Sequence, residues 1–375
     1  MAENSFPISP SRRNFLSAST GALAAAVAAP HFAPASVAPA SSSAEPAPQN
    51  PPRKIPIGVF DPVFENLPLD AMIDKISAMG IEAVEIGTGG YPGSPHCPVE
   101  ELLDDSGKLR AWKNRFENRN IHVATLSCHG NPLHPDAKLA QRDAEVFRRT
   151  VLLAEKLDVK VVVGFAGCPG GSPADTMPNW STFRWPPEFG QVLDWQWKEK
   201  VIPYWKQAAR FAREHGIHQL AFEMCPNQVV YNPKTLFHLR EAVGEEIGAN
   251  CDLSHLFWQG CDAVEVIHLL GKQNALFHAH MKDTVMFENN VAKYGVLNFA
   301  PDDNDLSQAS ETFRAVGYGH SANTWKEIVK AYMDVGYQGI LSIENEDPIL
   351  PGEVGVERAV SVLKNVRSEL LGIAA

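Results

Sequence analysis

After Pro52, short apolar runs rich in valine and isoleucine alternate with longer segments whose apolar residues recur at helical spacing. This alternation is typical of βα units that build a parallel sheet. The pattern predicts eight strands, at residues 55–60, 83–87, 122–127, 159–165, 219–223, 248–252, 276–281 and 339–344. A predicted helix follows each strand, so we expect an α/β fold, a closed (β/α)8 TIM barrel.

The helical periodicity places the helices at residues 67–79, 107–119, 137–157, 198–215, 233–243, 261–270, 324–335 and 355–371. Two connections are much longer than a structural turn needs, residues 166–197 after the fourth strand and residues 283–323 after the seventh. Both come after the carboxyl ends of strands, where barrel enzymes build their active sites. No internal repeat and no second folded domain is predicted.

The composition fits one large enzyme-sized domain. The chain has 375 residues, of which 45% are hydrophobic, and its net charge is -11. Binding to nucleic acid depends on clustered lysine and arginine, so an acidic chain without a basic run argues against that partner. The six cysteines stand singly, without the CxxC spacing of a zinc site, and are expected to be small buried residues.

The first 54 residues have a different character. Arg12 and Arg13 directly precede a modest apolar stretch at residues 15–29, and alanine, proline and serine dominate the residues after that stretch. This pattern resembles a twin-arginine (Tat) export signal, which we assign to residues 1–40, with a flexible linker at 41–54 and the barrel at 55–375. The apolar stretch is too short to span a membrane. We therefore expect export by the Tat machinery to the periplasm or the outside of the cell.

Three carboxylates and one imidazole stand near the ends of predicted strands five to eight. They are Glu223, Asp252, His280 and Glu344. Because strand carboxyl ends of a barrel converge on one rim, these side chains can become the ligands of a single cation. Oxygen donors with one nitrogen suit Mn²⁺, Mg²⁺ or Co²⁺, whereas a closed zinc site would use more sulfur or nitrogen.

Four segments carry a family resemblance: DLSHLFWQGCD, HAHMKD, FRAVGYGH and LSIENED. They resemble the xylose-isomerase-like TIM barrel family, and within it the exported proteins labelled sugar phosphate isomerase/epimerase. The resemblance implies that the four residues above are the metal ligands. It also implies that Glu223 and Glu344 are catalytic, because in related ketose 3-epimerases two glutamates exchange protons with the substrate carbon.

Such a site would catalyse proton transfer next to a carbonyl. A cation that binds the carbonyl and a neighbouring hydroxyl lowers the barrier to removing the adjacent proton and stabilises the enediolate that forms. One carboxylate then serves as the base, and an acid on the other face returns the proton or helps to expel a hydroxyl. Isomerisation, epimerisation and β-elimination share this first step.

Eight further polar residues are candidates for contacts to a carbohydrate substrate. They are Glu85, His129, His255, His278, Lys282, Asp283, Arg314 and His320. Structural roles compete with these assignments: His255 as a hydrogen-bonded structural residue, His278 as barrel filling, and Lys282 with Asp283 as a local ion pair. Four tryptophans, Trp185, Trp195, Trp197 and Trp258, are candidates for walls that stack on sugar rings.

The H-x-K-D element formed by residues 280–283 departs from the ketose 3-epimerases and is closer to the inosose-dehydratase-like branch. We therefore expect an isomerase or epimerase for a free sugar, keto-sugar or polyol, with a lyase acting on 3-keto-glycosides or inososes as the alternative. An endonuclease-IV-like nuclease and a non-catalytic sugar-binding protein are more distant alternatives. No motif for nicotinamide or nucleotide binding is present, and a homo-oligomer is left open.

Overall fold

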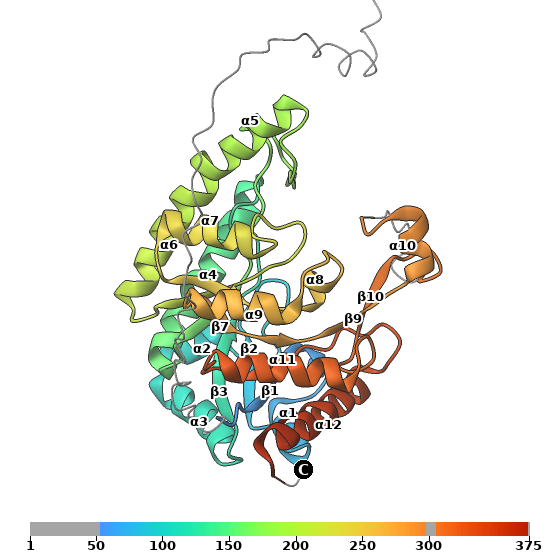
Figure 1. The fold of residues 1–375 in the computed structure, drawn as a ribbon. Helices are drawn as coiled ribbons and strands as arrows, with labels where there is room; N and C mark the ends of the chain where they lie inside the picture. Colours follow the sequence, from blue (N-terminus) through green and yellow to red (C-terminus); the bar gives the residue numbers. More distant parts are fainter. Residues whose placement is uncertain (1–52, 298–304, 374–375) are drawn as a thin grey trace, which may run out of the picture. The chain divides into compact units, whose positions relative to one another are not determined.

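The structure is a computed structural model that describes residues 53–297 and 305–373 (Figure 1). The predicted export signal at residues 1–40 and most of the predicted linker lie outside these residues. None of the described helices is long and apolar enough to cross a membrane.

Nine parallel strands of the described chain form one sheet, in the order β7-β6-β5-β4-β3-β2-β1-β11-β8. Their bounds are β1 (Ile57–Phe60), β2 (Ala83–Gly87), β3 (His122–Ser127), β4 (Val161–Gly164), β5 (Gln219–Glu223), β6 (Ile247–Asn250), β7 (Leu276–His278), β8 (His280–Met281) and β11 (Leu341–Ile343). The two ends of the sheet, β7 and β8, are separated in the chain by Ala279 alone. The sheet therefore closes almost completely around itself, which confirms the predicted TIM barrel.

Residues 276–281, predicted as one seventh strand, are two short strands. β7 pairs with β6 on one side, and β8 pairs with β11 on the other. The register against β6 shifts between Ala249 and Asn250. Residues 276–281 therefore pair with β6 at their beginning and with β11 at their end. His280 and Met281 consequently lie beside β11 rather than beside β6.

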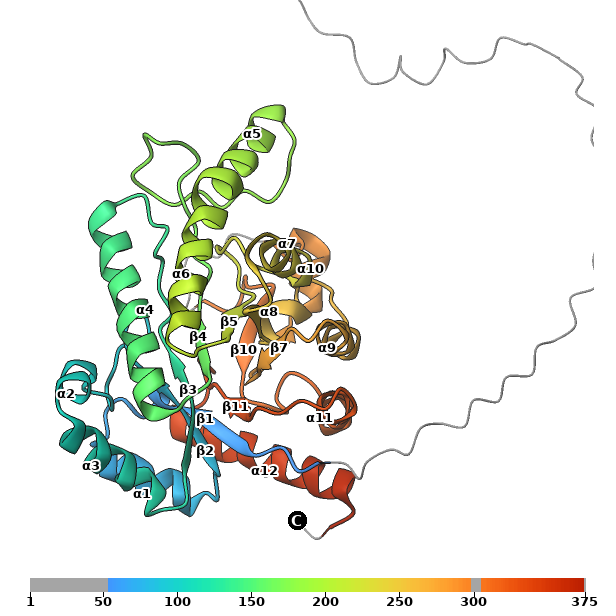
Figure 2. The same cartoon turned by 90° about the vertical axis from the view of Figure 1, so that its left-hand side faces the viewer.

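The helices cover the outside of the barrel, and each predicted helix has a counterpart (Figures 1 and 2). They are α1 (Leu69–Ala78), α3 (Ser106–Glu117), α4 (Ala137–Leu157), α6 (Ile202–Glu214), α7 (Pro233–Val243), α9 (Ala263–Lys272), α11 (Ala322–Asp334) and α12 (Gly352–Leu371). Short additional helices are η2 (Asp61–Phe64), α2 (Val99–Asp104) and α8 (Ser254–Phe257). Apolar side chains of the helices and of the outward face of the strands form one large core.

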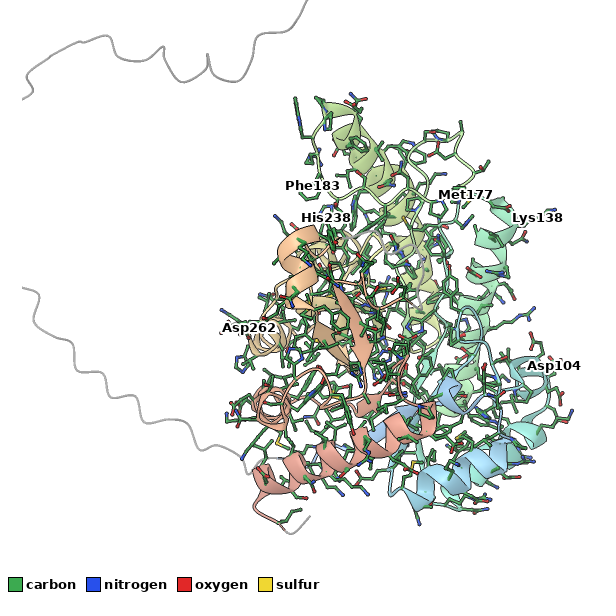
Figure 3. The ribbon with its side chains drawn as sticks, turned by 90° about the vertical axis from the view of Figure 1, so that its right-hand side faces the viewer. Asp104, Lys138, Met177, Phe183, His238 and Asp262 are labelled. Carbon is green, nitrogen blue, oxygen red and sulfur yellow. The ribbon has the colours of Figure 1, made fainter. Side chains whose placement is uncertain are left out.

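The two long connections contain structure that the periodicity did not predict. The connection after β4 contains α5 (Pro187–Trp195), which runs through the π-helical turn η3 (Gln196–Val201) into α6. Met177 and Phe183, in the same connection, are exposed (Figure 3). The connection after β8 contains α10 (Glu288–Tyr294) and an antiparallel hairpin of β9 (Asp283–Met286) and β10 (Glu311–Arg314). The hairpin strands are four residues each, too short for a clear alternating pattern.

Candidate metal centre

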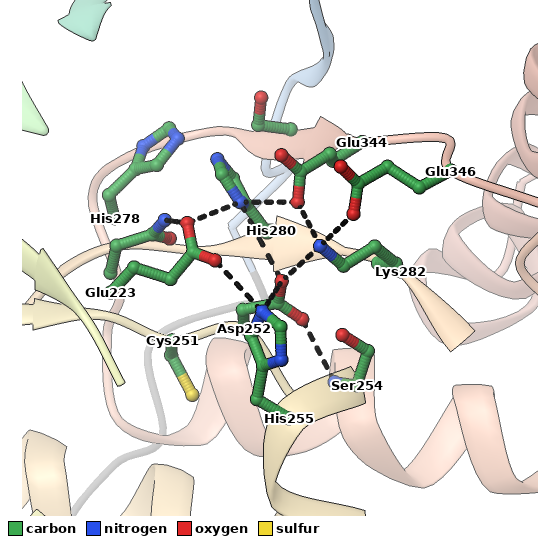
Figure 4. Close-up of polar contacts among 12 residues, drawn as sticks. Glu223, Cys251, Asp252, Ser254, His255, His278, His280, Lys282, Glu344 and Glu346 are labelled. Carbon is green, nitrogen blue, oxygen red and sulfur yellow. Dashed lines mark hydrogen bonds and ion pairs between the residues drawn. The ribbon is translucent and has the colours of Figure 1, made fainter. Parts of the chain in front are cut away.

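The four predicted ligands meet at the carboxyl ends of four neighbouring strands (Figure 4). Glu223 is the last residue of β5, Asp252 follows β6 by two residues, His280 begins β8 and Glu344 follows β11. One ligand atom from each lies within 4.8 Å of the others. His280 Nδ1 is 3.0 Å from Glu344 Oε2, 3.4 Å from Glu223 Oε2 and 3.9 Å from Asp252 Oδ2. We call these four residues the metal-ligand cluster.

The metal-ligand cluster fits a hard divalent cation. His280 Nδ1 and Asp252 Oδ2 are buried and have no hydrogen-bond partner of acceptable geometry. Lys282 Nζ is 2.9 Å from Asp252 Oδ2, but this contact is an ion pair without hydrogen-bond alignment. Buried polar atoms normally have partners, and leaving them without one is costly. Three carboxylates and one imidazole that face one another are the donor set expected for Mn²⁺, Mg²⁺ or Co²⁺.

Glu85, on β2, holds the imidazole of the metal-ligand cluster in place. Its carboxylate is 3.1 Å from His280 Nε2 and 2.7 Å from His278 Nε2, and both side chains are fully buried. A carboxylate only accepts hydrogen bonds, so Nε2 of His280 donates to Glu85, and Nδ1 is the nitrogen at which a cation in the cluster would bind. Burial would raise the pKa of Glu85, but the charges and hydrogen bonds of the two histidines hold it well below its usual range.

Two hydroxyl groups complete the shell around Glu85. Ser342 Oγ donates at 2.6 Å, and Ser127 Oγ donates to the other carboxylate oxygen. Glu85 and His278 were predicted as substrate contacts, and both lie at 0% exposure behind the metal-ligand cluster. Neither lines the cavity that opens onto the cluster.

Three side chains orient Glu223 at the end of β5. His129 Nε2 and His255 Nε2 each donate to one of its carboxylate oxygens at 3.0 Å, and Asn250 Nδ2 donates at 3.2 Å. Burial would raise the pKa of Glu223, but the hydrogen bonds from neighbouring imidazoles hold it well below its usual range. Glu223 is therefore an ionised carboxylate with a fixed orientation.

Lys282 lies between the metal-ligand cluster and the rim of the barrel. Its ammonium group is 2.5 Å from Glu344 Oε2 and 2.9 Å from Glu346 Oε2, and it lies 4.7 Å from the centre of the Phe313 ring. Burial would lower the pKa of Lys282, but the surrounding carboxylates raise it well above its usual range. By contrast, burial raises the pKa of the Glu344 carboxyl, and the nearby positive charges offset only part of that shift.

A cavity of 450 Å³ opens onto the metal-ligand cluster. Five of the residues predicted to act in catalysis or substrate binding line it: His129, Glu223, His255, Lys282 and Glu344. A larger hollow of 740 Å³ lies at the opposite end of the barrel, where residues such as His122, Gln219 and Leu276 begin the strands, and no member of the cluster lines it. The chemistry therefore belongs to the smaller cavity.

Asp283, Arg314 and His320, also predicted as substrate contacts, lie outside the lining of this cavity. Arg314 Nε donates to Asp347 at 2.8 Å. His320 Nδ1 is 2.7 Å from Asp283 Oδ1, and its ring stacks on Phe257. These three residues fix the connection after the hairpin, and none of the four candidate tryptophans lines the cavity either.

Several residues that support the site were not predicted from the sequence. Asn250, Ser127 and Ser342 are polar positions at the ends or inside of otherwise apolar strands, a signal that is present in the sequence. Phe313 had no such signal, because the hairpin that brings its ring 5.2 Å from His255 was not predicted.

Comparisons with known proteins agree with this architecture. The sequence model of the family described as xylose isomerase-like TIM barrel matches residues 73–366. The chain is 36% identical over 306 residues to the uncharacterized protein YfiH of Bacillus subtilis (strain 168), and the match covers 81% of this chain and 96% of that protein.

Two solved structures are similar in fold. The probable 3-DHS dehydratase AsbF of Bacillus anthracis superposes with a TM-score of 0.58 at 14% identity, over 83% of this chain and 99% of that one. A D-psicose 3-epimerase crystallised in the presence of D-fructose superposes with a TM-score of 0.53 at 15% identity, over 85% of this chain and 100% of that one. At these identities the likeness concerns the fold alone.

Proposed function

Because the chain belongs to the xylose isomerase-like TIM barrel family, we propose that it is a divalent-metal-dependent sugar isomerase or epimerase. Its substrate would be a free sugar, a keto-sugar or a related polyol, and the reaction would move a proton on the carbon next to a carbonyl. The observation that carries this proposal is the metal-ligand cluster, with its unpartnered buried nitrogen and oxygen atoms. The epimerase of similar fold supports it by analogy.

The residues of the cluster divide the work of proton transfer. A bound divalent cation would supply Lewis acidity to the substrate carbonyl and so acidify the neighbouring carbon. Glu223, which is ionised and held by three donors, is the candidate base for that proton. Glu344, whose pKa burial raises, is the candidate acid that returns a proton. The two carboxylates approach His280 Nδ1 from β5 and from the end of β11.

A second candidate reaction is elimination, in which the enzyme is a metal-dependent lyase or dehydratase. Here Glu223 would remove the proton, the bond from the next carbon to its oxygen substituent would break, and a protonated Glu344 would protonate the departing oxygen. The raised pKa of Glu344 is compatible with this reaction as well, because it increases the fraction of the carboxyl that carries a proton at a given pH. The dehydratase of similar fold is consistent with it.

Incubation in D₂O with Mn²⁺, Mg²⁺ or Co²⁺ separates the two candidates. Ketoses and 3-keto-glycosides are offered, and products are analysed by NMR and mass spectrometry. Deuterium next to the carbonyl in an otherwise intact sugar supports isomerisation or epimerisation, whereas an unsaturated or cleaved product supports elimination. If neither change occurs with any of the three metals, both candidate reactions are refuted.

We also propose that the protein acts after Tat-dependent export, in the periplasm or outside the cell. Arg12 and Arg13 ahead of the apolar residues 15–29 support this proposal. A cation bound inside a closed barrel would be acquired before translocation of the folded chain.

A further inference from the structure

The cavity beside the metal-ligand cluster is lined by two kinds of side chain. One kind is polar and includes the carboxylates, His129, His255 and Lys282. The other kind is apolar and stands at or after the ends of β1, β2 and β4: Phe60, Pro62, Val63, Tyr91, Pro92 and Phe165. We call this second set the apolar wall; proton transfer at the metal-ligand cluster gives it no role.

Tyr91 lines the cavity and leaves most of its side chain exposed. Its ring centre lies 6.1 Å from that of Phe165, yet Tyr91 remains 67% exposed. Its backbone N–H donates to the carbonyl oxygen of His129 at 2.7 Å, and the His129 imidazole donates to Glu223 Oε2 at 3.0 Å. His129 therefore connects the backbone of Tyr91 to Glu223, the candidate catalytic base, through two hydrogen bonds.

The loop that carries Tyr91 is fixed at both ends. Asp61 accepts from the backbone N–H of Gly87 at 2.6 Å, and its second oxygen lies 2.6 Å from His96 Nδ1, in a fully buried pair. Between these anchors Gly90 has a φ of +77°, and a Cβ atom there would stand 1.9 Å from the His129 carbonyl oxygen. An exposed aromatic ring buries little apolar surface and so adds little to the stability of the fold. Because the backbone of this loop is already fixed, a ligand that stacks on the ring would lose little conformational entropy of the protein on binding.

Apart from the cation that the metal-ligand cluster would bind, the cavity offers little free positive charge to an anionic ligand. Among the described residues that line it, Lys282 is the one lysine or arginine, and its ammonium already contacts carboxylates of Glu344 and Glu346. Glu65 and Glu223 add further negative charge. The cavity volume of 450 Å³ falls within the roughly 300–1,000 Å³ that is typical of pockets for drug-sized ligands.

We propose that the apolar wall is a subsite for an aromatic or other apolar substituent of the substrate, which stacks on Tyr91. The substrate is then a neutral glycoside whose sugar faces the metal-ligand cluster and whose aglycone faces the apolar wall. The apolar wall offers no positive charge to the phosphate group of a phosphorylated monosaccharide. This inference rests on the proposed action on carbohydrates and narrows its substrate class.

Binding of two unreactive glycosides tests the subsite. Phenyl β-D-glucopyranoside and methyl β-D-glucopyranoside share the sugar and differ in the substituent. By calorimetry we expect the phenyl glycoside to bind about tenfold more tightly, the scale of one aromatic contact. Tyr91→Ala should remove this preference and Tyr91→Phe should keep it. Tyr294→Ala, at an exposed tyrosine outside the cavity lining, is the matched control.

Four results would overturn the subsite: equal affinity for the two glycosides, binding of neither glycoside, a preference that survives Tyr91→Ala, or glucose 6-phosphate binding as tightly as the phenyl glycoside. Neither glycoside has a carbonyl for the proposed chemistry, so the comparison does not depend on turnover. A clear phenyl preference without proton transfer to any keto-sugar would refute the proposed function and leave the subsite standing.

Discussion

Replacing Asp283 by asparagine tests whether one buried carboxylate organises the carboxyl rim of the barrel. Asp283 starts β9 and is fully buried. Its oxygen Oδ2 accepts from three backbone N–H groups and an indole, and Oδ1 accepts from a backbone N–H and an imidazole. These donors are Gly317 N, Gly319 N, His320 N and Trp325 Nε1 for Oδ2, and Thr284 N and His320 Nδ1 for Oδ1.

Asparagine has the same shape but only one acceptor oxygen. If the asparagine oxygen takes the place of Oδ2, the asparagine NH₂ group faces the N–H of Thr284. If the side chain is turned the other way, the NH₂ group faces the four donors that Oδ2 now accepts from. In either orientation, donors are left without an acceptor. A buried hydrogen bond to a charged group contributes about 1.5–3 kcal/mol, and an unpaired buried donor costs about 1–3 kcal/mol. Because such losses are not additive, we expect Asp283→Asn to lower the free energy of unfolding by about 3–5 kcal/mol.

Urea unfolding followed by tryptophan fluorescence measures this loss. Asp305→Asn is the matched control, because Asp305 is exposed and its Oδ1 accepts from Ser307 N at 3.0 Å; a change within about 0.5 kcal/mol is expected there. A loss below about 1 kcal/mol for Asp283→Asn at pH 7 would refute the reasoning.

The pH dependence of this difference has a definite sign. Burial would raise the pKa of Asp283, but hydrogen bonds from His320 and Trp325 lower it below its usual range. In the unfolded chain the Asp283 carboxyl has a pKa of about 3.9. The contribution of Asp283 to the free energy of unfolding is therefore complete above that pH. It is lost as the pH falls through the lower pKa that Asp283 has in the folded protein. The gap between wild type and Asp283→Asn should shrink in that window; a constant gap would contradict the linkage.

Three further outcomes are expected. Glu85→Gln should weaken Mn²⁺ binding by roughly 10- to 100-fold in a metal titration, because the imidazole that it orients loses its charged acceptor; unchanged affinity would contradict this role. Glu223→Gln should lower the rate of solvent deuterium exchange into a substrate by at least about 100-fold, whereas Glu101→Gln, at an exposed position of α2, should have no effect; equal rates for Glu223→Gln and wild type would exclude Glu223 as the base. Replacing both Arg12 and Arg13 by lysine should abolish export in cell fractionation, and continued export would remove the Tat assignment.

Much of the barrel was readable from local sequence pattern. The strands at residues 83–87, 122–127 and 219–223 have the predicted bounds, because short apolar runs between glycine-rich turns specify buried parallel strands locally. The positions of Glu223 and Glu344 at strand ends were predicted for the same reason. In a barrel the topology then places such positions on one rim.

The tertiary structure decided the features that depend on contacts between distant residues. Glu85 and His278 are 193 residues apart, and only closure of the barrel makes one carboxylate the acceptor for two imidazoles. The change of partner between β7 and β8, and the hairpin that brings Phe313 to Lys282, likewise depend on pairing that no local period encodes. Local sequence pattern was enough to place Glu223 and Glu344 at strand ends, and hence at the rim, because it specifies where each strand stops. The fold decided which rim residues meet, because meeting is set by long-range packing.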